Sequence, residues 1–348
     1  MAHDGFEEVE ELLIELVKAG GSDLHMSSGN YAMIRVNGDL RKVSDKPIPS
    51  KSMVRWLENL LPESQMSELE SHGDIDFAFS LDENMRFRGS AFRSTGYLSI
   101  AIRYLNAKIP SFEQIALPPV AQTWANKQTG LIIVTGPTGS GKSTTVASMV
   151  NSAHQEVAHH IVTIEDPIEY ILPKGKGVVR QREIGVDAYD FPRAIRACLR
   201  EDADIVVVGE MRDQETIASA ITVAETGHLV FATLHTSSAA QAVDRIIDTF
   251  DSASQPLIRS RLSSCLVCVI YQRLVPAIDG GRTAAYEILV ANNGIKNLIR
   301  EGKTHQIPNM MTTGMNEGMQ TMEVALQRLT KEGKISKEFA ADFLKQNG

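Results

Sequence analysis

A glycine-rich stretch near the middle of the chain carries the residue types that bind phosphate. It reads Gly-Pro-Thr-Gly-Ser-Gly-Lys-Ser over residues 136–143, between the apolar run 131–134 and a helix-forming stretch at 144–150. Glycines let successive backbone N–H groups turn toward phosphate oxygens, and the following helix adds the positive end of its dipole. In this strand–loop–helix setting, the pattern predicts a P-loop and not merely a glycine-rich turn.

Two side chains at the end of this stretch have defined roles in P-loop chemistry. Lys142 is placed to reach the β- and γ-phosphates, and the Ser143 hydroxyl is placed to ligate Mg²⁺. We therefore expect a nucleoside triphosphate and Mg²⁺ as ligands. The residues of this stretch expected to contact nucleotide are Gly136, Pro137, Thr138, Gly139, Ser140, Gly141, Lys142, Ser143 and Thr144.

Acidic residues follow two apolar runs further along the chain. Glu165, Asp166 and Glu169 lie within five residues, and Pro167 breaks the run before them and fixes the turn. The second run, 205–208, is followed by Gly209, where a Walker B strand usually ends in Asp, and then by Glu210. Such carboxylates can hold Mg²⁺ or orient the attacking water. The alternatives are an ordinary acidic loop for the first group and a helix-capping carboxylate for Glu210.

Two histidines, His228 and His235, bracket the apolar run 229–234. A single histidine at a strand end is more often structural, but a pair in a nucleotide-binding domain suggests contact with the nucleotide. His235 stands at the carboxyl end of the run and is the better candidate for sensing the γ-phosphate. His228 is retained as a second candidate contact to the nucleotide.

The N-terminal part of the chain carries four arginines on its expected strands. Arg86 and Arg88 alternate along one strand and so share a face, while Arg93 and Arg103 lie further on. Solvated surface side chains are one interpretation. The other is that they cross to the ATP of a neighbouring subunit as arginine fingers, which raise phosphoryl-transfer rates by roughly 10³–10⁵.

The order of expected elements divides the chain into two domains. Residues 1–105 combine helices at 7–18 and 51–71 with strands at 32–36, 75–79, 86–92 and 98–104, which indicates an α+β domain. Residues 106–119 hold three prolines and read as a linker, and residues 120–348 form the second domain. There, strands at 131–135, 160–165, 204–209 and 229–234 alternate with helices, and short helices follow residue 290. This alternation predicts a mostly parallel sheet that binds ligands at the carboxyl ends of its strands.

The composition narrows the classes of protein to which the chain can belong. Hydrophobic residues make up 43% of the chain and charged residues 22%, and the formal net charge of −8 gives no bulk attraction to nucleic acid. No apolar run approaches the roughly 18–20 residues that span a bilayer, and the N-terminus lacks a signal-peptide pattern, so we expect a cytosolic protein. Cys265 and Cys268 have no second pair for zinc, which predicts buried thiols in a helix-compatible run, 262–270.

Taken together, the motifs resemble the type II/IV secretion ATPase superfamily over nearly the whole chain. The matching segments are the N-terminal Gly-Gly-Ser-Asp-Leu-His at 20–25, the Walker A motif at 136–143, the acidic box at 163–169, the atypical Walker B motif at 205–212 and the histidine box at 225–236. The resemblance implies a PAS-like N-terminal domain, a RecA-like C-terminal domain and a ring of six subunits that binds ATP. It also implies the preference for adenine.

The resemblance also suggests roles for particular residues. Glu169 would be the catalytic carboxylate, Glu210 the Walker B acid and Mg²⁺ ligand, and His235 the sensor of the phosphate state. Arg88 and Arg103 match the N-domain arginines of the family, and Arg93 falls where the pattern is looser.

Two features separate branches within the superfamily. The chain shows neither the extra N-terminal domain nor the four-cysteine zinc element typical of assembly and secretion motors, which favours the branch that retracts type IV pili. Residues 294–301 read Gly-Ile-Lys-Asn-Leu-Ile-Arg-Glu and keep the core of a segment typical of retraction motors, with departures at Gly294 and Lys296; Ala203 replaces a usual proline.

The expected protein is thus a hexameric ATPase for pilus retraction and twitching motility. The resemblance places it at the cytoplasmic face of the inner membrane, on a platform protein and possibly beside a second retraction ATPase, with no nucleic acid. The alternatives are a pilus-assembly or secretion motor, an accessory ring for a partner motor, and a DNA translocase.

Overall fold

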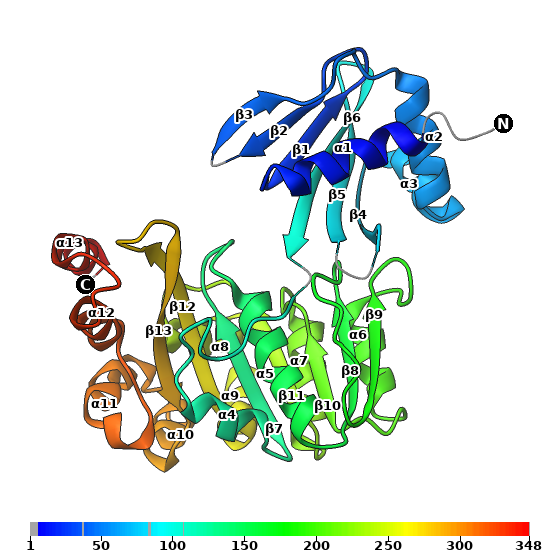
Figure 1. The fold of residues 1–348 in the computed structure, drawn as a ribbon. Coiled ribbons are helices and arrows are strands. Elements are labelled where there is room, and N and C mark those ends of the chain that lie inside the picture. The colour runs from blue at the N-terminus through cyan, green and yellow to red at the C-terminus, as the bar shows by residue number, and fades with distance from the viewer. Residues whose placement is uncertain (1–5, 37, 83–84, 107, 348) are drawn as a thin grey trace. The chain divides into compact units, whose positions relative to one another are not determined.

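The computed structural model describes residues 6–36, 38–82, 85–106 and 108–347 (Figure 1). The chain forms two compact units, one comprising Met1–Lys108 with Pro167–Ile171 and the other Ile109–Asp166 with Leu172–Gly348. The expected linker, residues 106–119, includes residue 107, which lies outside the described residues. The short segment Pro167–Ile171 carries part of the acidic box into the first unit.

The first unit is an antiparallel sheet with three helices. Its six strands lie in the order β3-β2-β1-β6-β5-β4. The strands are β1 (Asp23–Ser27), β2 (Met33–Val36), β3 (Asp39–Lys42), β4 (Asp74–Ser80), β5 (Met85–Ser94) and β6 (Tyr97–Asn106), and the helices are α1 (Phe6–Lys18), α2 (Ser50–Leu60) and α3 (Glu63–His72). The strands β1 and β3 were absent from the sequence prediction.

The single helix predicted over residues 51–71 is wrong, because the chain turns at Leu61 and Pro62 between α2 and α3. Proline lacks the backbone N–H that a helix interior requires, so it stands at the start of a new helix instead. The core of this unit is aromatic. The ring centroids of Trp56 and Phe79 are 5.3 Å apart, and those of Phe79 and Phe87 are 5.2 Å apart.

The second unit is built on a seven-stranded sheet with the order β13-β12-β7-β11-β10-β8-β9. All neighbouring pairs are parallel except the hairpin of β12 and β13. The strands are β7 (Gly130–Thr135), β8 (His160–Glu165), β9 (Val178–Glu183), β10 (Ile205–Val208), β11 (Leu229–Leu234), β12 (Leu266–Pro276) and β13 (Arg282–Val290). The four predicted strands are confirmed, and three further strands extend the sheet on both sides.

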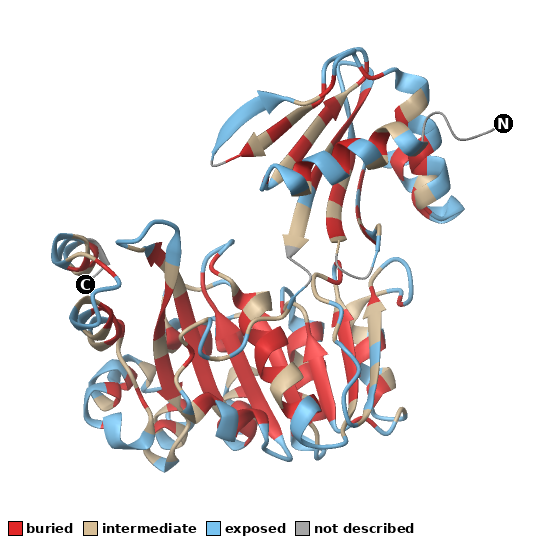
Figure 2. Ribbon diagram, in the orientation of Figure 1, coloured by how far each residue is buried: buried red, intermediate tan, exposed pale blue. Residues whose placement is uncertain are grey.

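Helices cover both faces of this sheet, as expected for a parallel α/β fold. Leu131 and Ile133 of β7 point into one hydrophobic cluster with the helices α6 to α9, whereas Ile132 and Val134 point into another with α4 and α5. The central strands β7 and β11 are accordingly buried along their whole length (Figure 2). The helices are α4 (Val120–Ala125), α5 (Lys142–Glu156), α6 (Phe191–Cys198), α7 (Gln214–Glu225), α8 (Ala239–Asp248) and α9 (Gln255–Cys265).

Short helices follow in the described C-terminal region, as the sequence predicts. The α-helices are α10 (Asn293–Arg300), α11 (Ile307–Thr313), α12 (Met322–Lys331) and α13 (Lys337–Asn347), and the 3₁₀-helices are η1 (Thr304–Gln306) and η2 (Met315–Glu317). None of the helices among the described residues has the length and apolar character needed to cross a bilayer.

The cysteines confirm one prediction and correct another. Cys198, Cys265 and Cys268 are free and buried, and burial raises the pKa of the Cys265 thiol to about 12. The expected helical run over 262–270 is wrong, because α9 ends at Cys265 and β12 begins at Leu266. The β-branched Val267, Val269 and Ile270 favour the strand.

Candidate nucleotide site

The P-loop joins the carboxyl end of β7 to the amino end of α5. Gly139 and Gly141 have φ angles of +74° and +87°, a backbone conformation that glycine adopts without strain. A Cβ on Gly136 would lie 2.4 Å from the carbonyl oxygen of Gln272 in β12, so the close packing of the loop against this strand also requires glycine. No side chain caps α5, which leaves its N-terminus suited to an anion.

The Lys142 side chain is turned back onto this loop. Its residue is 8% exposed, and Nζ donates to the carbonyl oxygens of Gly136 at 3.0 Å and Pro137 at 3.1 Å. Nζ also lies 3.4 Å from Nδ1 of His235, at the carboxyl end of the neighbouring strand β11. The structure therefore brings together a lysine and a histidine that are 93 residues apart in the sequence.

The contacts of His235 define its protonation state. Burial and the nearby Lys142 ammonium lower the pKa of the imidazole below 6.5, so the ring is neutral at pH 7. Its Nε2 lies 3.3 Å from a carboxylate oxygen of Glu210, which can only accept a hydrogen bond. The proton of the neutral ring is therefore on Nε2, and Nδ1 accepts from Lys142.

Glu210 follows β10 and connects His235 to further charged groups. Its second carboxylate oxygen lies 2.8 Å from Nη2 of Arg212, and Nη1 of Arg212 lies 3.8 Å from Asp166 after β8. The hydrogen bond to Glu210 raises the pKa of the Arg212 guanidinium. Lys142, His235, Glu210, Arg212 and Asp166 thus form one continuous series along the carboxyl ends of four neighbouring strands.

Two residues at the site had no role in the sequence prediction. Arg212 lies inside the Walker B segment. Its positive charge, two residues after the acidic Glu210, was the sequence feature that could have indicated a role at the site. Gln272 is a buried amide, 1% exposed, whose Nε2 donates to the Ser140 carbonyl oxygen at 2.5 Å. Its position directly after the apolar run 266–270 and Tyr271 of β12 was the available sign that this amide supports another element.

The predicted catalytic carboxylate Glu169 and the three predicted site arginines lie in the first unit. Arg88 pairs with Asp76 at 3.0 Å and Arg103 with Asp23 at 2.8 Å, both on the sheet of that unit. The side chain of Arg93 is exposed near the end of β5. Glu169 belongs to the segment Pro167–Ile171. The structure therefore gathers Lys142, Glu210 and His235 around the P-loop, while Glu169 and the arginines belong to the other unit.

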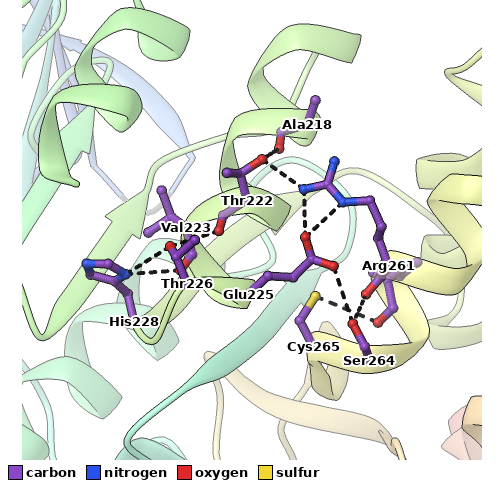
Figure 3. Close-up of polar contacts among 10 residues, drawn as sticks. Ala218, Thr222, Val223, Glu225, Thr226, His228, Arg261, Ser264 and Cys265 are labelled. Carbon is purple, nitrogen blue, oxygen red and sulfur yellow. Dashed lines mark hydrogen bonds and ion pairs between the residues drawn. The ribbon is translucent and has the colours of Figure 1, made fainter.

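His228 is not part of this cluster. It precedes β11, whose six residues span about 20 Å, and its backbone carbonyl accepts from Gly130 at the start of β7. Its Nδ1 lies 3.1 Å from the Val223 carbonyl oxygen and 3.4 Å from Oγ1 of Thr226, at the end of α7 (Figure 3). His228 therefore lies at the end of the sheet opposite to the P-loop of the same chain, and its contact with nucleotide stays a prediction.

The polar groups at the loop fit a nucleotide better than a bare metal ion. Oγ of Ser140 is buried with no hydrogen-bond partner in the described structure, as expected of a hydroxyl that faces an anionic ligand. Over the described ranges, no group of three or more His, Cys, Asp or Glu residues is arranged to hold a metal. Ser143 and Glu210 would therefore need phosphate oxygens to complete the coordination of Mg²⁺.

A P-loop after one strand of a parallel sheet, with an acid and a histidine after its neighbours, defines a P-loop nucleotide-binding protein of the α/β class. A family model described as Type II/IV secretion system protein matches residues 6–338. The chain belongs to this family.

Individual relatives are similar over nearly their full length. The chain is 43% identical over 335 residues to the type IV pilus retraction ATPase PilT of Pseudomonas aeruginosa, covering 96% of this chain and 97% of that protein. It is 41% identical to a twitching motility protein of Neisseria gonorrhoeae, with 92% and 87% covered. A crystal structure of the pilus retraction motor PilT with bound ADP matches with a TM-score of 0.87 and 42% identity, over 95% of each chain. The predicted fold class and superfamily are confirmed.

Proposed function

We propose that this chain is a subunit of an ATP-hydrolysing motor that powers type IV pilus retraction and thereby twitching motility. The observation that carries the proposal is the contact series from Lys142 through His235 to Glu210 beside the P-loop. It occurs in a chain that is 43% identical to PilT over 96% of its length. The chain is an ATPase, and the mechanical use of that activity is the part that needs testing.

The site explains how the chain would respond to the phosphates of ATP. Phosphate oxygens replace the carbonyls of Gly136 and Pro137 as acceptors for Lys142, because an anionic oxygen adds the attraction of opposite charges to a bond that the ammonium otherwise makes to a neutral carbonyl. His235 accepts from Lys142 and donates to Glu210, so a movement of Lys142 after loss of the γ-phosphate reaches Glu210 through His235. Ser143 and Glu210 would hold Mg²⁺, which would supply positive charge to offset the charge of the transferred group.

Residues of the first unit complete this proposal. Glu169 is the carboxylate that activates water, and six copies of the chain form a ring in which Arg88, Arg103 and Arg93 of one copy reach the ATP of its neighbour. Mixed rings test the arginines: Arg103→Ala subunits should lower the activity of wild-type neighbours by more than their share. A loss of activity in proportion to the share of variant subunits would contradict a role of Arg103 in the site of the neighbouring copy.

The ring acts at the cytoplasmic face of the inner membrane, on a platform protein and beside a second retraction ATPase.

A count of surface pili tests the direction of the motor. The host's only gene copy would encode Glu210→Ala, with Glu225→Ala at the opposite end of the same sheet as the matched control. A retraction motor predicts excess pili and loss of surface motility for Glu210→Ala, and wild-type behaviour for the control. A bald surface would instead identify an assembly motor, and an unchanged pilus count would indicate secretion or an accessory ring.

A further inference from the structure

One arginine of β5 is buried, unlike the two that follow it in the same strand. Arg86 is 8% exposed, whereas the Arg88 side chain is 41% exposed and Arg93 is exposed as well. Burial of a guanidinium removes its hydration, which is costly unless hydrogen bonds take the place of water. The partners of Arg86 therefore indicate what this buried charge does.

The Arg86 guanidinium binds a backbone carbonyl of the acidic box. Nε and Nη2 both donate to the carbonyl oxygen of Ile168, at 2.8 Å and 2.6 Å. Nη1 donates to Oγ of Ser80, directly opposite in β4, at 3.2 Å. The guanidinium is planar and its donors have fixed directions, so two bonds to one oxygen hold the position of that carbonyl.

This carbonyl belongs to the peptide that joins Ile168 to Glu169. Because a peptide unit is planar, holding its oxygen also holds the backbone nitrogen and Cα of Glu169. Pro167 and Ile168 are buried, and the ring of Pro167 restricts its own φ angle. The segment Pro167–Ile171 belongs to the same unit as β5. The backbone from which the Glu169 side chain extends is therefore fixed by Arg86 and by the proline before it.

The Glu169 side chain has no comparable support of its own. It is half-buried, and among the described residues it takes part in no hydrogen bond or ion pair. A carboxylate that served the fold would be expected to have such partners. The place that this carboxylate can reach is thus determined by its backbone.

We propose that Arg86 is a positioning residue that holds the backbone of Glu169, and thereby its carboxylate, in place for hydrolysis. The inference rests on the proposed role of Glu169 as the carboxylate that activates water. It gives Arg86 a different role from that of the arginines proposed to reach the ATP of a neighbouring copy, Arg88, Arg93 and Arg103. Arg86 acts within its own chain and through Glu169.

Steady-state ATP turnover of the full chain tests the proposal. Arg86→Met removes the donors and keeps an apolar side chain in the buried position. It should lower kcat by about tenfold or more, because a displacement of about 1 Å can cost about 10²-fold in rate. KM for ATP should stay within about twofold, since Lys142 and the P-loop bind the phosphates.

Arg35→Met is the matched control. Arg35 lies in β2 of the same sheet, and its Nη1 also donates to a backbone carbonyl, that of Gly38, at 2.7 Å. The control should keep the kcat of the wild type. An Arg86→Met chain with the kcat of the wild type, or a control that loses as much, would overturn the proposal.

A double-mutant cycle with Glu169→Gln separates positioning from a general loss of structure. If Arg86 acts through Glu169, then Arg86→Met should lower kcat in the wild type but leave the residual kcat of Glu169→Gln unchanged. Losses that multiply would overturn the positioning role. Arg86→Lys, which keeps the charge without the planar fork, takes the place of Arg86→Met in the cycle if that variant fails to fold. A Glu169→Gln chain with the kcat of the wild type would instead overturn the proposed catalytic carboxylate, and this inference with it.

Discussion

The two ends of strand β11 carry one histidine each, and the structure gives them different surroundings. At the carboxyl end, His235 lies between the Lys142 ammonium and the Glu210 carboxylate, with Arg212 and Asp166 beyond. At the amino end, His228 is bonded to a backbone carbonyl and a threonine hydroxyl. One end of the strand is an electrostatic network, and the other consists of local hydrogen bonds.

The difference follows from the helices that meet each end of a parallel sheet. The carboxyl ends of the strands lead into helix N-termini, where unpaired N–H groups and the helix dipole attract anions. The amino ends lie near helix C-termini, and there the Nδ1–H of His228 satisfies the carbonyl of Val223 in the last turn of α7. The same residue type therefore lies among charged side chains beside the P-loop at one end and bonds to the backbone of a helix at the other.

The largest effect should come from removing the positive charge at the carboxyl end. Lys142→Gln should lower the turnover of ATP by about 10²–10³ or more, because the amide cannot neutralise charge on the transferred phosphate. Lys127→Gln, just before β7 at the amino end, is the matched control and should stay within about twofold of the wild type. Steady-state phosphate release measures the turnover of both variants. Equal losses of turnover would contradict the proposed difference between the two ends of the sheet.

Variants of His235 and His228 test the difference between the two ends of β11 directly. His235→Ala should reduce turnover by about tenfold or more, the effect on a rate of losing about 1.4 kcal/mol of transition-state stabilisation. His228→Ala should leave turnover unchanged and lower the free energy of unfolding by about 0.5–1.5 kcal/mol, the value of a structural hydrogen bond. Turnover and urea denaturation of both variants measure the two effects. A His228→Ala chain that is stable but inactive would contradict its structural assignment.

The pH dependence of stability tests the electrostatics around His235. The groups facing its ring are Lys142 and Glu210, with Arg212 behind the carboxylate. Because the folded pKa of His235 lies below 6.5, the unfolded chain binds the proton more readily. Its contribution is present above pH 6.5 and is lost as the pH falls from there toward the folded pKa. His235→Ala should remove part of the loss between pH 7.5 and 5.5 in urea denaturation, and an unchanged slope would contradict the lowered pKa.

The chemistry of the site could be predicted from the sequence where it depends on local pattern. The P-loop, Glu210 and His235 each follow an apolar run, and a parallel sheet places all such ends on one edge. The direct contacts could not be predicted, because Lys142 meets His235 only through the strand order β7-β11-β10. The separate apolar runs do not indicate which strands are neighbours in the sheet. His228 was assigned to the nucleotide because it and His235 bracket one apolar run.

Parts of the fold were missed where a strand departs from the apolar pattern or imitates another element. The edge strand β9 reads Val-Val-Arg-Gln-Arg-Glu, and its polar residues are tolerated because one side lacks a neighbouring strand. The first residues of β12 continue the apolar spacing of α9, so the transition at Leu266 is set by sheet pairing with β7. Local sequence preference predicted the central strands, and tertiary pairing determined the edges of the sheet.

The smallest effect is expected from the ion pair at the amino end. Nη2 of Arg261 lies 2.7 Å from Glu225, and both side chains are 26% exposed, so water weakens their attraction (Figure 3). Arg261→Leu should lower the free energy of unfolding by about 0.5–1 kcal/mol and leave ATP turnover unchanged. A double-mutant cycle with Glu225→Gln, measured by urea denaturation, isolates the pair from the bond of Arg261 to Thr222. A coupling energy near zero would mean that the pair is held by the packing around it. A loss of turnover in either single variant would show that the amino end of the sheet, too, takes part in the chemistry.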